Sequence, residues 1–347
     1  MSELKVSASP NFQALLAQQR VSLLVSTYQA GKLMILRADR GKLNVHFRSF
    51  KKAMGIAANH TRIAIGTAAH IHELYNMPAA AANLESAQQH DACYLPRNSH
   101  VTGDIDIHEM SWAGDELWFV NTRFSCLCTL DRAYSFRPRW RPPFVSAYAP
   151  EDRCHLNGLA VADDRPRYVS ALAQSDRTQG WRDRKADGGL VMEIESNEIV
   201  TQGLSMPHSP RWYRDRLWVL ESGQGSLATV DLATGQLTTV AQCPGFTRGL
   251  DFVGPLAFIG LSQARESAVF SGLPLTERQE TRICGVWVVN IETGQTLAHL
   301  KFESGVEEIF AVQALRGICF PEVMPEGEAL VGKSYALPPS ALAEVAF

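Results

Sequence analysis

The amino-acid sequence predicts an all-β fold, a six-bladed β-propeller closed by pairing a C-terminal inner strand with N-terminal outer strands. The main observation is a recurring pattern of a polar or bulky residue, a small or acidic residue and an apolar run. A second apolar strand follows each copy roughly ten residues later, and repeats that contain several strands are typical of propellers. The copies begin at Met54, His108, Asn157, His208, Arg248 and Glu307.

The other strands of each blade are predicted from apolar segments and turn residues. Second strands are expected at RIAIGT from Arg62, ELWFVN from Glu116, RYVSA from Arg167, RLWVLE from Arg216 and LAFIG from Leu256. Two hairpins follow the later copies, LATVDLATGQLTTV from Leu227 and VWVVNIETGQTLAHL from Val286. Gly235 and Gly294 stand where their turns need a positive φ, so these segments predict paired outer strands.

The two ends of the chain predict how the ring closes. After Glu307 only the strand EEIFAVQ remains, because the tail over residues 321–347 is rich in Pro, Gly, Ala and Glu. That composition predicts coil with one short terminal helix over residues 340–347. After a lead-in of residues 1–20, the segments VSLLVST, KLMILR and LNVHFRSF follow with no inner strand before them. Pairing them with the C-terminal strand leaves no open sheet edge, so one domain over residues 1–347 is expected.

Composition and charge argue against several partners and locations. The formal net charge is −3 with acids and bases interspersed, so the chain lacks the basic field that binds nucleic acid. No apolar run approaches the roughly 18 residues of a membrane helix, and the N-terminus lacks the pattern of a secretory signal. We therefore expect no membrane partner and a cytoplasmic location. Seven cysteines lie scattered without a CxxC pair, which predicts free thiols.

The predicted inner strands bring distant polar residues together around the channel. Residues at equivalent repeat positions should face one another there, so the copy starts form one ring and Glu109 and Glu308 belong to the next. Asp106, His155, Met206 and Phe246 lie just upstream. Burying such polar groups without partners costs on the order of several kcal/mol each, so they pair with one another, with water or with a ligand. A water-filled ring without chemistry stays an alternative.

Loops at the same end of the channel are expected to complete the site. Two are long, SALAQSDRTQGWRDRKADGG from Ser170 and the stretch over residues 261–282, and a third runs over residues 66–103. Loops of this length in a compact fold are usually lids or binding elements. The ligand contacts expected from loops are Tyr28, Arg123, Trp181 and Arg182.

The ring allows two interpretations of its chemistry. In the first, His108, Asn157 and His208 hold a divalent metal ion. Additional ligands would come from Glu109, His155 or Glu307. In the second, His108 or His208 is a general acid or base and no metal is needed. A substrate carboxylate would then open an ion pair between Arg248 and Glu307.

Both interpretations predict an enzyme, a hydrolase, lyase or isomerase, that acts on a small polar or anionic substrate or on a modified peptide. The candidate catalytic residues are His108, His208, Glu109 and Glu307. The candidate substrate-binding residues are Arg248, Tyr28, Arg123, His155, Glu308 and Trp181. The alternative is a non-catalytic propeller that binds a small molecule or docks a protein partner through its long loops.

Several segments together resemble an uncharacterised bacterial family of conserved hypothetical proteins built around a domain of unknown function. They are STYQAGKL from Ser26, MGIA from Met54, DIHEM from Asp106, LNGLA from Leu156, MPHSPRW from Met206, TRGLDF from Thr247 and GVEEIF from Gly305. This resemblance implies a propeller-like repeat and no particular activity. The LNGLA segment also resembles the PNGLA inner strand of gluconolactonase-type six-bladed propellers, in which the asparagine is a metal ligand. That second resemblance implies a metal-binding role for Asn157.

Overall fold

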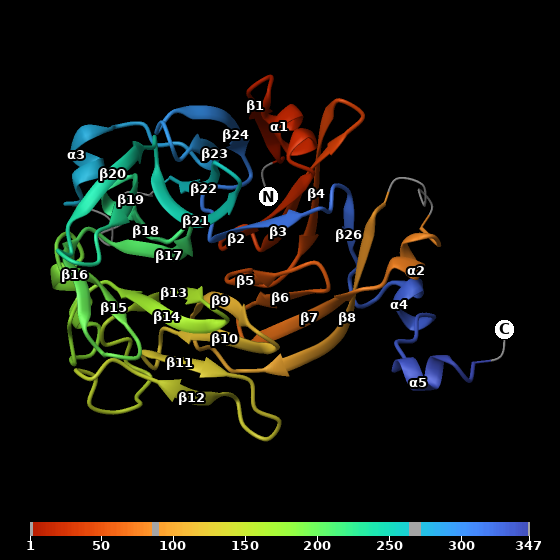
Figure 1. Cartoon of the computed structure of the whole chain (residues 1–347), viewed down its shortest axis with the longest axis horizontal. Helices are drawn as coiled ribbons and strands as arrows, with labels where there is room; N and C mark the ends of the chain where they lie inside the picture. The colour runs from red at the N-terminus through yellow and green to blue at the C-terminus, as the bar shows by residue number, and fades with distance from the viewer. Residues whose placement is uncertain (1–2, 85–89, 264–271, 346–347) are drawn as a thin grey trace.

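Six sheets radiate from a central axis in the computed structural model, which describes residues 3–84, 90–263 and 272–345 (Figure 1). Each sheet is one blade with its innermost strand at the axis. The inner strands contact one another in the cyclic order β25, β5, β9, β13, β17, β21 and back to β25. The six-bladed propeller predicted from the repeat is therefore confirmed.

The strands of each blade, from the axis outward, follow the chain. Blade 1 contains β25 (Ala311–Arg316), β2 (Val21–Thr27), β3 (Lys32–Asp39) and β4 (Lys42–Ser49). Blade 2 contains β5 (Ile56–Ala58), β6 (Arg62–Gly66), β7 (His70–Asn76) and β8 (Ala92–Val101). Blade 3 contains β9 (Ile107–Ala113), β10 (Glu116–Asn121), β11 (Cys126–Thr129) and β12 (Arg137–Trp140).

The second half of the ring repeats this arrangement. Blade 4 contains β13 (Leu156–Ala162), β14 (Arg165–Ala171), β15 (Gly189–Glu193) and β16 (Ile199–Leu204). Blade 5 contains β17 (Pro207–Tyr213), β18 (Arg216–Glu221), β19 (Ser226–Val230) and β20 (Leu237–Gln242). Blade 6 contains β21 (Phe246–Val253), β22 (Leu256–Ser262), β23 (Gly285–Asn290) and β24 (Thr296–Ser304).

Blade 1 closes the ring as predicted, because its inner strand comes from the C-terminal part of the chain and its other strands from the N-terminal part. Strand β25 pairs with β2 in antiparallel register, from Val21 opposite Arg316 to Ser26 opposite Ala311. In Figure 1 a blue strand from the C-terminal part of the chain runs beside the red N-terminal strands β2 and β3. The inner strand starts at Ala311, which is later than the predicted start at Glu307.

The lead-in and the tail contain more structure than the sequence predicts. Strand β1 (Lys5–Ala8) adds a fifth strand to blade 6 by pairing with β24, and helix α1 (Phe12–Gln18) follows it. The tail contains β26 (Pro321–Val323), which pairs in parallel with β8, and helices α4 (Ala329–Gly332) and α5 (Pro339–Leu342). The prediction of coil with one terminal helix was therefore wrong for β26 and α4, and residues 346–347 lie outside the described chain.

The segments predicted as long loops divide into two kinds. Much of the segment 66–103 is sheet, because it contains the strands β7 and β8, which are joined by a connection that includes helix α2 (Pro78–Ala81). Apart from residues 85–89, which are not described, it therefore belongs to blade 2 and is not a lid. The segment after Ser170 does form an insertion with the 3-10 helix η1 (Gly180–Arg184). Of the segment 261–282, the described part contains the end of β22 and helix α3 (Pro274–Arg278).

The apolar core lies between adjacent blades and holds their inner strands around the axis. One cluster of buried apolar residues occupies each of the six interfaces. Strand β10 shows why, because successive side chains of a strand point to opposite faces. Phe119 packs between blades 2 and 3, and Val120 packs between blades 3 and 4.

All seven cysteines are free thiols, and six of them are buried. Among the described residues, no helix is long and apolar enough to cross a membrane.

Candidate functional site

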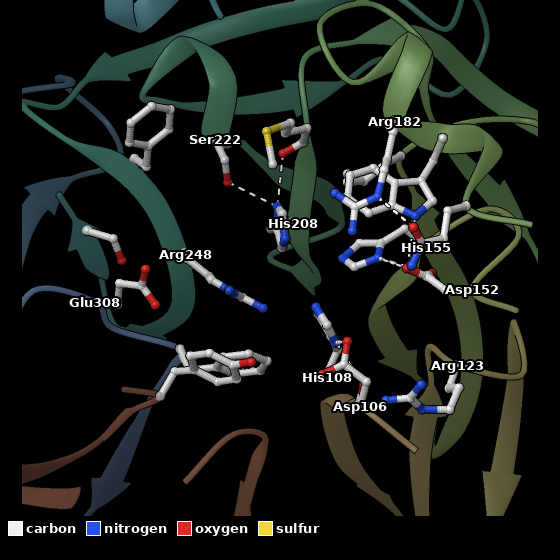
Figure 2. Close-up of a pocket in the computed structure, with 18 of the residues that line it drawn as sticks. Asp106, His108, Arg123, Asp152, His155, Arg182, His208, Ser222, Arg248 and Glu308 are labelled. Carbon is white, nitrogen blue, oxygen red and sulfur yellow. Dashed lines mark hydrogen bonds and ion pairs between the residues drawn. The ribbon is translucent and has the colours of Figure 1, made fainter. Parts of the chain in front are cut away.

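A cavity of about 480 Å³ lies at the end of the channel where the inner strands begin. Histidines His108, His155 and His208 line it together with Arg248 and aromatic side chains (Figure 2). The aromatic residues are Tyr28, Trp181, Phe246 and Phe310, and the remaining charged ones are Lys52, Asp106, Arg123, Asp152, Arg182 and Glu308. The cavity therefore combines apolar walls with charged groups.

A left-handed backbone position shapes the wall in four consecutive blades. Lys52, Asp106, His155 and Met206 occur two positions before the copy starts of blades 2 to 5, and their φ angles are 60°, 51°, 51° and 49°. This conformation is unfavourable for residues other than glycine and is concentrated at functional sites in proteins. All four of these residues line the cavity.

The ring of His108 is fixed through its Nδ1 atom. Nδ1 lies 2.9 Å from the carbonyl oxygen of Asp106 and 2.8 Å from Oγ1 of Thr122. Thr122 donates its own proton to the carbonyl of Leu156 at 2.6 Å, so its oxygen accepts from the imidazole. Both groups facing Nδ1 are acceptors, which places the ring proton on Nδ1 and leaves Nε2 as a basic lone pair.

His208 in blade 5 has the same arrangement. Its Nδ1 lies 2.9 Å from the carbonyl oxygen of Met206 and 3.0 Å from Oγ of Ser222. Ser222 donates to the carbonyl of Thr247 in the next blade. Nδ1 therefore carries the proton here too, and the ring centroids of His108 and His208 are 6.4 Å apart.

The environment keeps both imidazoles neutral. Burial is the larger cause and the neighbouring Arg248 guanidinium the second, and together they hold the pKa of His108 well below its ordinary value. The same two causes, in the same order, hold the pKa of His208 well below its ordinary value. Two neutral rings with Nδ1–H bound to the protein are suited to accept protons at Nε2.

His155 has a different partner. Its Nδ1 lies 2.9 Å from Oδ2 and 3.1 Å from Oδ1 of Asp152. Trp181 donates its indole N–H to Oδ2 of the same carboxylate at 2.9 Å. The Trp181 ring also packs on the imidazole with a centroid distance of 4.3 Å. The insertion that carries η1 thus contributes directly to the wall of the cavity, as Figure 2 shows.

Arg248 extends into the cavity over an aromatic surface. Its guanidinium lies 3.6 Å from the ring centroid of Phe310, which in turn stacks on Tyr28 at 5.8 Å. Burial lowers the pKa of Arg248, and the nearby Glu308 carboxylate acts in the opposite direction. Within the described residues, Arg248 forms no side-chain hydrogen bond, so its donors remain available to a ligand.

Two further basic residues of the cavity wall, Lys52 and Arg123, form ion pairs with Asp104 and Asp106. Lys52 Nζ lies 3.4 Å from Asp106 and 3.8 Å from Asp104, and Arg123 donates to Asp104 at 2.8 Å. Burial opposes the charge of Lys52, but Asp106 and Tyr28 outweigh it and raise the pKa of the amine. These cations are therefore partly neutralised by the protein itself.

Most of the predicted site residues line this cavity. They are His108, His208, Arg248, Tyr28, Arg123, His155, Glu308 and Trp181. Glu109 does not line it, because it lies farther along β9 and accepts a hydrogen bond from Arg211 at 2.8 Å. Glu307 is exposed and precedes β25, because the inner strand of blade 1 starts later than predicted.

Asn157 does not form a metal site with the two histidines. Its Oδ1 accepts a hydrogen bond from Ser170 at 2.6 Å, and the side chain is buried outside the cavity lining. No group of three or more His, Cys, Asp or Glu side chains in the described parts of the chain is arranged to hold a metal ion. The described side chains therefore give no support to the predicted divalent ion, which stays a prediction.

Sequence reasoning missed the residues that support the histidines. Thr122 follows His108 by 14 positions, and Ser222 follows His208 by the same 14 positions. Ser170 follows Asn157 by 13. A hydroxyl at the end of each second strand was therefore a visible part of the repeat. Lys52 also stood at a repeat position, because it precedes the copy start Met54 by two residues as Asp106 precedes His108. Asp152 had no comparable signal, because it enters the site through local backbone geometry.

The comparison with protein families is consistent with this repeat. The family model described as domain of unknown function (DUF4915) matches residues 10–324. The chain belongs to this family. A comparison with curated proteins found no similar sequence.

Solved structures share the fold at low sequence identity. A protein of unknown function from Bacteroides caccae has a TM-score of 0.54 and 11% identity, over 85% of this chain and 99% of that chain. A chain of the nidogen/laminin complex has a TM-score of 0.52 and 9% identity, over 86% of this chain and 100% of that chain. A catalytically inactive virginiamycin B lyase from Staphylococcus aureus with quinupristin has a TM-score of 0.43 and 11% identity, with 86% and 100% covered. The first two similarities, with TM-scores above 0.5, concern the fold alone.

Proposed function

We propose that this propeller is an enzyme that transfers a proton within a small substrate bearing a carboxylate, as an isomerase or a lyase. One observation carries the proposal. His108 and His208 both have Nδ1 bound to acceptors of the protein, and both rings line the cavity into which Arg248 extends. Bases of fixed orientation beside an available cation are what proton abstraction next to a carboxylate requires.

Binding of the carboxylate is assigned to Arg248. A guanidinium offers two parallel N–H donors to a carboxylate, and charge-assisted hydrogen bonds are stronger than neutral ones. Phe310 supports the flat face of the guanidinium and leaves its edge for the ligand. The apolar part of the substrate would then pack against the aromatic walls.

The chemical step begins at the carbon next to the carboxylate. Nε2 of His108 or His208 takes the proton, and the C–H electron pair remains on the substrate. The negative charge spreads onto the carboxylate oxygens, where Arg248 stabilises it. The substrate then takes up a proton at another atom, or it expels a leaving group from the neighbouring carbon. The first course makes the enzyme an isomerase and the second makes it a lyase.

The test is hydrogen exchange with solvent. The protein is incubated in deuterium oxide with a panel of small carboxylates, and proton NMR follows the hydrogen on the carbon next to each carboxylate. We expect exchange or conversion of at least one compound, and a loss of about 100-fold or more in at least one of the variants His108→Gln and His208→Gln. His60→Gln is the matched control, because His60 is an exposed residue outside the cavity lining.

The alternative is a propeller that binds an anion without catalysing a reaction. In that case carboxylates would raise the melting temperature of the wild-type protein, while none would exchange a hydrogen or be converted. Equal exchange rates in the wild type and both histidine variants would also contradict the proposal.

A further inference from the structure

The three histidines of the cavity differ in the chemical group that contacts Nδ1. His108 and His208 each contact a backbone carbonyl and a hydroxyl, which are neutral acceptors. His155 contacts both oxygens of the Asp152 carboxylate. A carboxylate compensates the positive charge of a doubly protonated imidazole, and neutral acceptors do so far less.

Trp181 strengthens this difference. Its indole ring packs on His155 at a centroid distance of 4.3 Å, and the face of an indole attracts a cation. Its N–H also holds Asp152 in place through the bond to Oδ2 at 2.9 Å. The Asp152 carboxylate is therefore held by two contacts, the Nδ1 atom of His155 and the indole N–H of Trp181.

The other histidines have the opposite surroundings. Arg248 disfavours a second proton on His108 and His208. One acid approaches His108, since Oδ2 of Asp106 lies 3.9 Å from Nδ1, but Lys52 lies 3.4 Å from Oδ1 of that carboxylate and offsets it. His155 is also close to His108, with ring centroids 4.8 Å apart, so a proton on one ring disfavours a proton on the other.

We infer that His155 is a further catalytic residue, the proton donor of the site, and that His108 and His208 are its proton acceptors. This assignment rests on the proposed function. In one turnover, Nε2 of His108 or His208 takes a proton from the substrate, and Nε2 of His155 gives its proton to the atom where the substrate is reprotonated or where the leaving group departs. The substrate thus loses one proton and gains another, and solvent then reloads His155 and deprotonates the acceptor.

Asp152 and Trp181 are the positioning residues of this donor. Asp152 acts by holding Nδ1–H and by compensating the charge, and Trp181 acts by holding Asp152 and by covering the ring. Asp152 and His155 both have left-handed backbone angles, with φ of 48° and 51°. The backbone strain at this pair is further support for a functional role.

The experiment measures the protonation of each ring in the substrate-free protein. Nitrogen NMR of protein labelled with 15N-histidine distinguishes the neutral tautomers from the doubly protonated ring, and single His→Gln variants assign the signals. As the pH is lowered, we expect His155 to become doubly protonated before His108 and His208. The latter two should remain Nδ1–H tautomers until a lower pH.

Two variants test the cause. Asp152→Asn should move the protonation of His155 to lower pH, because the carboxylate that compensates its charge is lost, and Trp181→Phe should move it less. Asp187→Asn is the matched control, because Asp187 lies in the same insertion but pairs with Arg184 on the surface. If Asp152→Asn is unstable, Trp181→Phe still tests whether these contacts favour the doubly protonated ring of His155.

The outcomes separate this inference from the proposed function, because no substrate is present. Protonation of His155 last, or unchanged behaviour in both variants, would overturn the assignment of the donor even if proton exchange is catalysed. Protonation of His155 first, together with the expected shifts, would support the assignment. The absence of catalysis on every carboxylate would then count against the proposed function alone.

Discussion

Two arginines of the inner region have opposite surroundings. Arg211 in β17 donates to the Glu109 carboxylate at 2.8 Å and to the carbonyl of Pro210 at 2.9 Å. Arg248 in β21 stacks on Phe310 and, among the residues described, forms no side-chain hydrogen bond. The charge of Arg211, farther along the channel, is thus neutralised by the protein. The charge of Arg248, in the cavity at the mouth of the channel, stays available. This difference indicates that the first arginine supports the fold and the second serves a ligand.

The largest effect is expected when the inner ion pair is broken. Glu109→Ala leaves the charge of Arg211 without its partner in the channel, and the loss of one member of a buried ion pair costs about 3–5 kcal/mol. Urea denaturation measures this change in the free energy of unfolding. A change below about 1 kcal/mol would show that Arg211 does not depend on Glu109.

Removal of Arg248 should affect binding and leave stability nearly unchanged. Arg248→Ala removes a charge-assisted hydrogen bond to the ligand, which is worth about 1.5–3 kcal/mol, or roughly a tenfold to hundredfold loss of affinity for any carboxylate that binds. Calorimetry measures the affinity, and urea denaturation measures the stability. A loss of stability as large as that in Glu109→Ala would remove the distinction between the two arginines.

The free energy of unfolding of the protein should depend on pH through the two histidines of the cavity. The pKa values of His108 and His208 are depressed in the folded state, so the unfolded chain binds protons more readily. The stabilisation is present above about pH 6.5, the ordinary value, and is lost as the pH falls below it, by up to about 1.4 kcal/mol per pH unit for each ring. Urea denaturation between neutral and mildly acidic pH should show a shallower dependence in the double variant His108→Gln/His208→Gln. Equal slopes would mean that these rings are not held neutral.

The smallest effect is expected at the hydroxyls that connect neighbouring blades. Thr122 bonds both His108 and the carbonyl of Leu156, so Thr122→Val should destabilise the protein by about 1 kcal/mol. Ser26→Ala is the matched control, because Ser26 donates to the carbonyl of Met54 and accepts from the Ala311 N–H, and in the described parts of the chain it forms no hydrogen bond with a histidine. Both variants should lose similar stability by urea denaturation, and only Thr122→Val should lower the exchange activity. Equal activity in the two would show that the hydroxyl has no role at His108.

The six-bladed architecture could be predicted from the sequence because each blade of a propeller carries a similar sequence pattern. The apolar runs identified the inner and second strands, and the unmatched strands at the two ends identified the closure through β25 and β2. Strand β26 was missed because three residues with a central glutamate have no alternation, and its pairing depends on tertiary contacts such as Arg48 with Glu322.

The site was predictable where a residue belongs to the repeat. His108, His208 and Arg248 occupy equivalent positions on their strands, and all three reach the cavity. Glu307 lies outside the cavity lining, because the inner strand of blade 1 begins at Ala311 and the repeat pattern predicts an earlier start. Asp152 could not be found, because its contact with His155 depends on left-handed backbone angles and on an insertion whose conformation the sequence pattern does not specify.

The most direct test of whether the cavity binds anions compares ligands that differ only in charge. Calorimetry would measure the binding of small carboxylates and of their neutral amides to the wild type and to Arg248→Gln. We predict that the carboxylates bind at least about tenfold more tightly than the amides in the wild type, and that the variant loses this preference. Amides that bind the wild type as tightly as the carboxylates, or a preference that persists in Arg248→Gln, would contradict the account.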